Sequence, residues 1–172
     1  FDDGGNIIRA VGEPLVMDSA VAEDSSTLAR IAEAAEPLNE LRAKVIGKSS
    51  ALIEGNRKFC RVQECEMGNL IADAMLDRVA AQGVTIALAN AGNIRASIEP
   101  GAVTMGQVLE VLPFQNTLAT FETLGQVIID ALENGVSQVE DVKGRFPQVA
   151  GLRYTWDSSI AANEGRIVEV LV

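Results

Sequence analysis

A stretch with helical periodicity leads directly into a short, nearly all-apolar run, and this succession restricts the fold to one that combines helices with a sheet. Residues 67–82 repeat apolar side chains every three or four positions, which predicts a helix with one apolar face. The side chains of that face are Leu70, Ile71, Ala74, Met75 and Val79. Residues 84–89 follow after Gly83 and are apolar enough for a buried strand. We therefore expect an α/β or α+β domain with a mixed β-sheet and packed helices.

The same two periodicities predict the remaining elements. Helices are expected over residues 25–45 and 125–138, and Pro37 inside the first of them predicts a kink or break. A capping-box pattern that begins at Thr104 predicts a short helix to about Val111. The remaining expected strands are residues 6–11, 14–17, 45–54, 118–124, 149–156 and 166–172.

Composition limits the classes of partner and chemistry. The 172-residue chain has a formal net charge of −10, which argues against nucleic acid as a partner because phosphate backbones select surfaces rich in Lys and Arg. No apolar run approaches the roughly 20 residues that span a bilayer, so no membrane contact is expected from this segment. The chain contains no histidine, which excludes Ser-His and Cys-His nucleophile pairs. Two cysteines without histidine do not fill a tetrahedral zinc shell unless carboxylates complete it, so no metal site is expected.

The two cysteines, Cys60 and Cys65, are separated by four residues. They are either two free, half-buried thiols or a disulfide that closes a small loop. A disulfide of this kind contributes on the order of 2 kcal/mol and implies an oxidising compartment. The spacing alone leaves both alternatives open.

One loop offers side chains for an anionic ligand. Residues 90–95 (Asn-Ala-Gly-Asn-Ile-Arg) directly follow the predicted buried strand, and ligand loops in α/β sheets favour the carboxyl ends of strands. Asn90 supplies a side-chain amide, and Arg95 can hold a carboxylate or phosphate through two parallel hydrogen bonds. The alternative is a turn between strands with a solvated arginine.

Arg61 and Phe114 are two further candidate binding residues. Arg61 lies between the cysteines, in a loop that a disulfide would hold rigid, and the alternative is an ordinary surface arginine. Phe114 follows Pro113, and its ring either stacks on a nucleobase, at ~1–3 kcal/mol per base, or belongs to the core. Asp73 and Asp77 fall on the helix face opposite the apolar one, which indicates a solvated face rather than an acid–base pair.

Taken together, four segments in a fixed order resemble the C-terminal domain of the 5'-nucleotidase family. That family includes ecto-5'-nucleotidases, periplasmic UDP-sugar hydrolases, apyrases and cyclic-nucleotide phosphodiesterases. The segments are residues 60–74, 90–95, 111–114 and 146–152. The similarity spans residues 9–172 and is nearest the ecto-5'-nucleotidase branch. Asn93 departs from it because the family usually has Gly there, and Glu66 stands where Asn is common.

The resemblance implies the substrate-binding domain of a metal-dependent hydrolase that releases phosphate from nucleotides. By similarity, Arg61, Asn90 and Arg95 would contact the nucleotide, and Phe114 would supply one face of a sandwich around the base. Two divalent metal ions of the Zn or Mn type would be bound by an N-terminal domain, with none bound by this segment. The segment by itself would then be inactive.

The resemblance also implies a domain organisation. Residues 1–24 would be the last strands and exit loop of the N-terminal metallophosphoesterase domain, and residues 25–45 a linker helix between domains. Residues 46–172 would be the substrate-binding domain, truncated at its C-terminus. Cys60 and Cys65 match the pair that is disulfide-bonded in the ecto-enzyme branch. This favours the disulfide and an extracellular, cell-surface or periplasmic location.

The expected partner is therefore a nucleotide or nucleoside, and the domain can also form a homodimer in the ecto-enzyme branch. The alternative hypothesis is a non-catalytic domain, for nucleotide binding, dimerisation or another interaction, in a relative that lacks the metal site. In a purely structural domain, Arg61, Asn90 and Arg95 need not converge on one cleft.

Overall fold

The computed structural model describes residues 1–172, which divide into two compact units, Phe1–Leu38 and Asn39–Val172. Residues 1–24 of the first unit form neither helix nor strand, so the strands predicted at residues 6–11 and 14–17 are wrong. A strand is stable beside another strand that shares its backbone hydrogen bonds, and no strand pairs with these residues. Their apolar side chains are exposed.

The helix α1 (Ser25–Ala43) begins in the first unit and ends in the second. The Asp24 carboxylate caps it by accepting hydrogen bonds from the Ser26 hydroxyl and the Thr27 backbone N–H, both at 2.7 Å. These bonds lower the pKa of Asp24 to about 2. The helix continues through Pro37, so of the predicted kink or break the break is absent. Proline has no N–H to donate, and on an exposed helix water can bond the carbonyl that is left without a donor.

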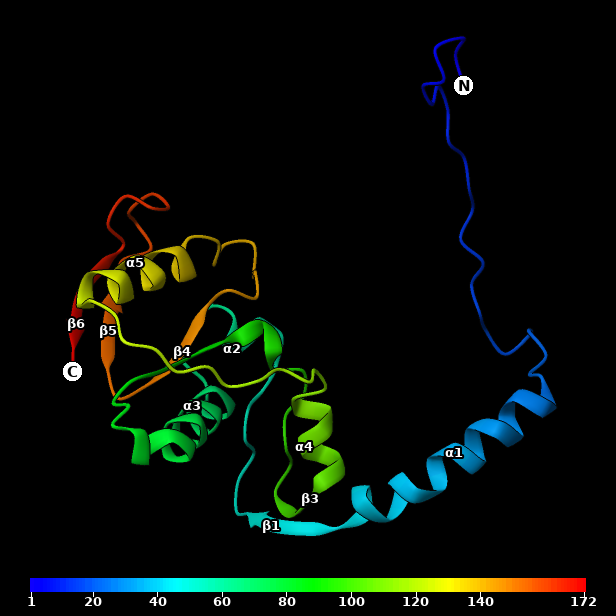
Figure 1. The fold of residues 1–172 in the computed structure, drawn as a ribbon, viewed down its shortest axis with the longest axis horizontal. Helices are drawn as coiled ribbons and strands as arrows, with labels where there is room; N and C mark the ends of the chain where they lie inside the picture. The colour runs from blue at the N-terminus through cyan, green and yellow to red at the C-terminus, as the bar shows by residue number, and fades with distance from the viewer. The chain divides into compact units, whose positions relative to one another are not determined.

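The second unit contains three two-stranded antiparallel sheets, which confirms the α+β class (Figure 1). Because all three pairs are antiparallel, the mixed β-sheet expected from the sequence is not present. The pairs are β1 (Val45–Ser49) with β3 (Gly101–Thr104), β2 (Ala87–Asn90) with β4 (Pro147–Ala150), and β5 (Arg153–Trp156) with β6 (Ile167–Leu171). The sequence predicts one strand over residues 149–156, but the chain turns at Gly151, whose φ of 77° separates β4 from β5. The strand predicted at residues 84–89 is present as β2, which begins later.

Besides α1, the second unit has four α-helices, of which α3 and α5 confirm the helical periodicities. They are α2 (Arg57–Cys60), α3 (Glu66–Val79), α4 (Met105–Val111) and α5 (Gly125–Val136), with the 3₁₀ turns η1 (Ala80–Gln82) and η2 (Ala91–Asn93). The predicted capping box opens α4: the Thr104 hydroxyl accepts from the Gln107 N–H at 3.3 Å, and the Gln107 side chain accepts from the Thr104 N–H at 2.8 Å. No helix is both long and apolar enough to cross a membrane.

The strand predicted at residues 118–124 is wrong. These residues connect α4 to α5 in an irregular path, and no strand pairs with them. Phe121 is 79% exposed, so the apolar alternation of this segment buries nothing. Alternation predicts which side chains share a face, but a strand also needs a neighbour for its backbone.

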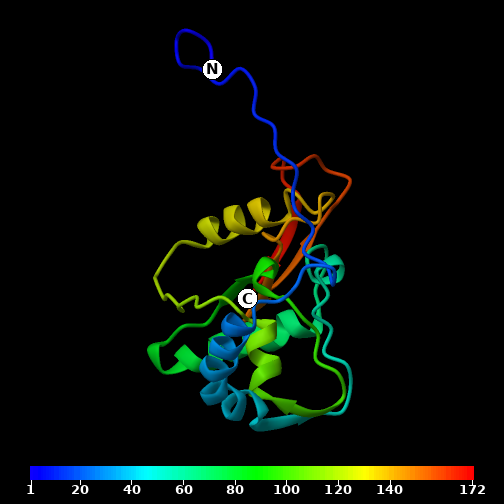
Figure 2. The same ribbon diagram turned by 90° about the vertical axis from the view of Figure 1, so that its right-hand side faces the viewer.

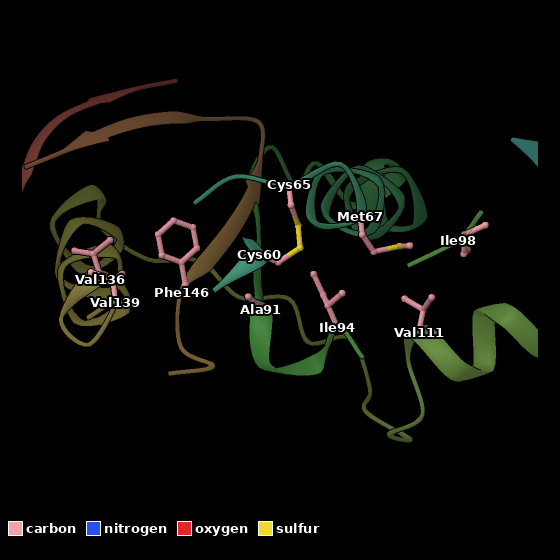
Figure 3. Close-up of a cluster of buried hydrophobic side chains, with 10 residues drawn as sticks. All are labelled: Cys60, Cys65, Met67, Ala91, Ile94, Ile98, Val111, Val136, Val139 and Phe146. Carbon is pink, nitrogen blue, oxygen red and sulfur yellow. A yellow bond between two sulfur atoms is a disulfide. The ribbon is translucent and has the colours of Figure 1, made fainter. Parts of the chain in front are cut away.

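The core of the second unit surrounds a disulfide bond between Cys60 and Cys65 (Figure 3). This bond is the pairing that the family resemblance favours. Met67 of α3 and Phe146 lie on its two sides, and all four residues are buried. α3 packs against β2 and β4, and α5 lies beside the hairpin of β5 and β6 (Figures 1 and 2). The disulfide loop, residues 60–65, directly precedes α3 and is joined to β4 by hydrogen bonds with the Gln148 side chain.

Candidate functional site

An open cleft of about 800 Å³ lies beside the end of β2 in the second unit. Two of the predicted binding residues, Asn90 and Phe114, line it. Further amides come from Asn93, Asn116, Asn134 and Gln138, and the positive charges of Lys143 and Arg145 lie on its border. No carboxylate lines the cleft, although the whole chain carries a net charge of −10. The cleft therefore offers amides, an aromatic ring and positive charge to a ligand.

Backbone contact between two glycines forms part of the cleft. The Gly92 N–H in η2 donates to the Gly144 carbonyl at 2.7 Å. A Cβ on Gly92 would lie 2.9 Å from that carbonyl, and a Cβ on Gly144 would lie 2.7 Å from the Gly92 Cα, so neither position accommodates a larger residue without a shift. The Asn90 side chain donates to the same carbonyl at 3.3 Å and accepts from the Asn93 side chain at 2.9 Å. These bonds fix the orientation of the Asn90 amide.

Arg95 and Phe114 meet at the cleft. The Arg95 guanidinium carbon lies 5.7 Å from the centroid of the Phe114 ring, which is a cation–π contact. The backbone N–H of Arg95 donates to the Val111 carbonyl at 3.0 Å, and this bond holds the end of the loop beside the end of α4. Phe114 is 51% exposed, so it is a surface residue and the core alternative is excluded.

Arg61 lies next to the same cleft. One of its terminal guanidinium nitrogens donates to the Val142 carbonyl at 3.4 Å, and its guanidinium carbon lies 3.8 Å from where a Cβ on Gly144 would be. Its Nε atom is buried and has no hydrogen-bond partner. Burial lowers the pKa of the Arg61 guanidinium, and the positive charges of Arg57 and Arg95 lower it further. Arg57, Arg61 and Arg95 thus form a cluster of like charges that an anion would stabilise.

The structure therefore brings all four predicted binding residues to one place. Asn90 and Phe114 line the cleft, Arg95 lies over the Phe114 ring, and Arg61 lies behind Gly144. Their roles toward a ligand stay predictions. Asp73 and Asp77 are exposed on α3 and take no part in the cleft, as the solvated-face interpretation expects.

Several residues at the cleft carried no signal that the sequence analysis used. Asn116, Asn134 and Gln138 are single polar residues without a motif. Lys143 and Arg145 flank Gly144 directly before the segment 146–152, and a glycine between two cations next to a recognised motif was a usable signal. Arg145 donates to the Asn134 side chain at 3.0 Å and to the Ser137 hydroxyl at 3.3 Å, so α5 sets its position.

The acidic residues and cysteines do not gather into a metal centre. No group of three or more His, Cys, Asp or Glu side chains is placed to hold a metal ion. The groups that the cleft offers to a ligand are amides, an aromatic ring and positive charges.

Comparison with known proteins decides the family. Residues 45–172 match the family described as "5'-nucleotidase, C-terminal domain". This chain belongs to that family. The fold agrees with this assignment: the chain superposes on the crystal structure of a 5'-nucleotidase precursor from Thermus thermophilus with a TM-score of 0.79. It is 45% identical in sequence, over 88% of this chain and 30% of that one.

Other members of the family are much longer than this chain. The human 5'-nucleotidase is 32% identical over 92% of this chain and 29% of its own length. The trifunctional nucleotide phosphoesterase protein YfkN of Bacillus subtilis is 38% identical over 83% of this chain and 10% of its own length. The structure of the Haemophilus influenzae NAD nucleotidase is 28% identical with a TM-score of 0.67, over 86% of this chain and 27% of that one. The chain thus spans less than a third of each of these relatives.

Proposed function

We propose that this chain is the nucleotide- or nucleoside-binding domain of a 5'-nucleotidase-type phosphohydrolase. The observation that supports this most strongly is the Arg95–Phe114 pair, which lies beside the Asn90 loop on a cleft without carboxylates. An exposed aromatic ring is suited to stack on a base, and arginines are suited to bind phosphate. A nucleotide combines both groups in one molecule.

Each residue has a role that its surroundings allow. The Phe114 ring stacks on the base, with ~1–3 kcal/mol per stacked base. The Asn90 amide, held in one orientation by its two hydrogen bonds, reads polar atoms of the base or ribose. Arg61 and Arg95 bind the phosphate, and Arg57 adds positive charge beside them. Lys143 and Arg145 attract the anionic end of the ligand from the border of the cleft.

Hydrolysis is proposed for a whole protein rather than for these residues. The relatives are named 5'-nucleotidase and nucleotide phosphoesterase, but the chain covers less than a third of each relative compared above. Because no three potential metal ligands gather here, we assign phosphate release to two divalent metal ions, of the Zn or Mn type, held by other residues of the whole protein. The present domain binds the substrate and orients its phosphate.

The disulfide supports a location outside the reducing cytosol. Cys60 and Cys65 are bonded and buried in the core, and disulfides persist in oxidising compartments. We propose that the whole protein is extracellular, attached to the cell surface or periplasmic.

A titration followed by NMR tests binding by this chain. AMP, adenosine, UMP and uridine are added to the isotope-labelled protein, and backbone amide shifts are recorded. We expect the largest shifts at residues 90–95 and near Phe114 and Gly144, with monophosphates binding more tightly than nucleosides. An absence of shifts with all four compounds, or shifts confined to β5 and β6, would contradict the proposal.

An assay of the whole protein tests the reaction. We expect phosphate release from AMP that depends on added Zn²⁺ or Mn²⁺ and stops in EDTA. Arg95→Gln should raise KM about tenfold or more, because it removes a charge-assisted contact to phosphate, while the melting temperature changes little for an exposed side chain. Binding without release from AMP, ADP, UDP-glucose or a cyclic nucleotide would favour the non-catalytic alternative.

A further inference from the structure

A buried glutamine lies under the loop that carries Arg61. Gln148 in β4 is 1% exposed, and its side-chain amide makes three hydrogen bonds. Its Nε2 donates to the Cys60 and Gln63 carbonyls, both at 2.8 Å. Its Oε1 accepts from the Cys65 N–H at 3.2 Å. All three partners belong to residues 60–65, the disulfide loop.

The surroundings of Gln148 are shaped to admit this amide. A Cβ on Gly68 would overlap the Gln148 side chain, so glycine at that position of α3 leaves the space the amide needs. A buried amide costs free energy unless it is hydrogen-bonded, and Gln148 has partners for its oxygen and for both N–H groups. An apolar side chain of similar size would fill the space equally well but could not bond both ends of the loop.

Arg61 is restrained from a second direction. Its guanidinium donates to the Val142 carbonyl at 3.4 Å. Val142 has a φ of 54°, a left-handed conformation that is costly for a β-branched residue. Such a conformation persists only where the surrounding structure enforces it, and here it directs the Val142 carbonyl at Arg61. The backbone of Arg61 is thus held by Gln148 and the disulfide, and its side chain by Val142.

We propose that Gln148 is a positioning residue, which holds the disulfide loop so that the Arg61 guanidinium faces the phosphate of the ligand. This inference rests on the proposed function, since it concerns the phosphate contact of the same cleft. Gln148 itself is buried and does not line the cleft. Its effect on binding therefore passes through Arg61.

The readout that separates positioning from simple stability is the ratio of affinities for AMP and adenosine. Both compounds carry the same base and ribose, and only AMP carries the phosphate that Arg61 would bind. A destabilised domain loses affinity for both in proportion to its unfolded fraction, which leaves the ratio unchanged. A displaced Arg61 lowers the affinity for AMP alone.

Two variants of similar shape, Gln148→Met and Gln148→Glu, are compared with the wild type by NMR titration of the full chain. Gln148→Met removes all three hydrogen bonds, and Gln148→Glu removes both donors. We expect the AMP-to-adenosine affinity ratio to fall about tenfold in each, as for the loss of one charge-assisted contact. Val79→Ala, a core truncation at the far end of α3, is the control and should leave the ratio unchanged.

A double-mutant cycle completes the test. In an Arg61→Gln background, Gln148→Met should change the ratio no further, because the residue it positions is gone. An unchanged ratio in folded Gln148 variants, an equal fall with Val79→Ala, or loss of the fold in both Gln148 variants would overturn the proposal. Failure of the wild type to bind either compound is a different result: it would reject the proposed function, and the positioning role with it.

Discussion

Two sides of the cleft are built differently. The anchored side, residues 60–65, 90–93 and 142–145, is fixed by the disulfide, by Gln148 and by the backbone bond between Gly92 and Gly144. The exposed segment, residues 112–124, carries Phe114 and has no regular structure. One side-chain bond, from the Thr120 hydroxyl to Gln82 at 3.1 Å, joins it to the end of η1.

The difference matches the demands of the two kinds of contact. Two parallel hydrogen bonds from a guanidinium to a phosphate need a defined orientation, and the anchored side restrains Arg61 accordingly. Stacking tolerates displacement of the ring because every base presents a flat face. Under the proposed function, the domain is more firmly held where Arg61 would bind phosphate, and less restrained where Phe114 would stack on the base.

Substitution of Gly144 by alanine should disrupt the anchored side and cause the largest loss of stability among the changes considered. The new Cβ would lie 2.7 Å from the Gly92 Cα, and backbone on both sides leaves little room to relax. We expect a loss of about 3 kcal/mol, measured by urea denaturation. Gly47→Ala in β1 is the matched control, because nothing lies within 4 Å of its Cβ. A similar loss in both variants would mean that the glycine contact does not hold the two loops together.

Reduction of the disulfide should weaken the same side by a smaller amount. Closing a loop this short lowers the conformational entropy of the unfolded chain, which stabilises the folded domain by about 2 kcal/mol. Because both cysteines are buried, the reductant should act only after denaturant opens the core. Urea curves with and without a phosphine reductant measure the difference. Coincident curves, with thiol labelling proving reduction, would show that Gln148 and packing hold the loop unaided.

Phe114→Ala tests the exposed segment. We expect adenosine to bind about tenfold more weakly, since one stacking face is lost. Stability should change by less than about 0.5 kcal/mol because the ring is half exposed. Phe121→Ala, in the same segment and 79% exposed, should change neither quantity. Equal effects of the two substitutions on adenosine binding would remove Phe114 from the site.

Val142→Asn should produce the smallest effect, and it should raise stability where the preceding substitutions lower it. Asparagine adopts the left-handed conformation more readily than valine, so relief at a φ of 54° should stabilise the domain by about 1 kcal/mol. The affinity for AMP should be unchanged, because the carbonyl that accepts from Arg61 belongs to the backbone. Val142→Ile keeps the β-branch and should give no gain. Thermal unfolding of both variants decides whether strain is stored at this turn.

The elements that the sequence predicted well are those whose partners are local. α3 and α5 follow from the spacing of their apolar residues, and α4 follows from the capping box at Thr104. The strands expected at residues 6–11, 14–17 and 118–124 did not form, because alternation says nothing about whether a second strand lies alongside. Residues 149–156 split in two at a single glycine.

The same distinction applies to the site. Arg61, Asn90, Arg95 and Phe114 lie in short motifs, and the structure gathers them around one cleft. Lys143, Arg145 and the amides of Asn134 and Gln138 reach the cleft through tertiary packing, which no periodicity encodes. The left-handed Val142 was beyond prediction for a related reason: valine avoids that conformation, so local preference points away from the structure that packing enforces.

The contact between Gly92 and Gly144 has a consequence for attempts to redesign ligand choice. Where these two residues meet, peptide groups rather than side chains face one another, with an N–H to carbonyl distance of 2.7 Å between heavy atoms. A point substitution cannot change the polarity of a peptide group. The polarity and shape of this part of the cleft are therefore set by the backbone conformation and not by side chains. Libraries that seek new specificity should therefore leave both glycines untouched and vary Asn116, Gln138 and Lys143 around them.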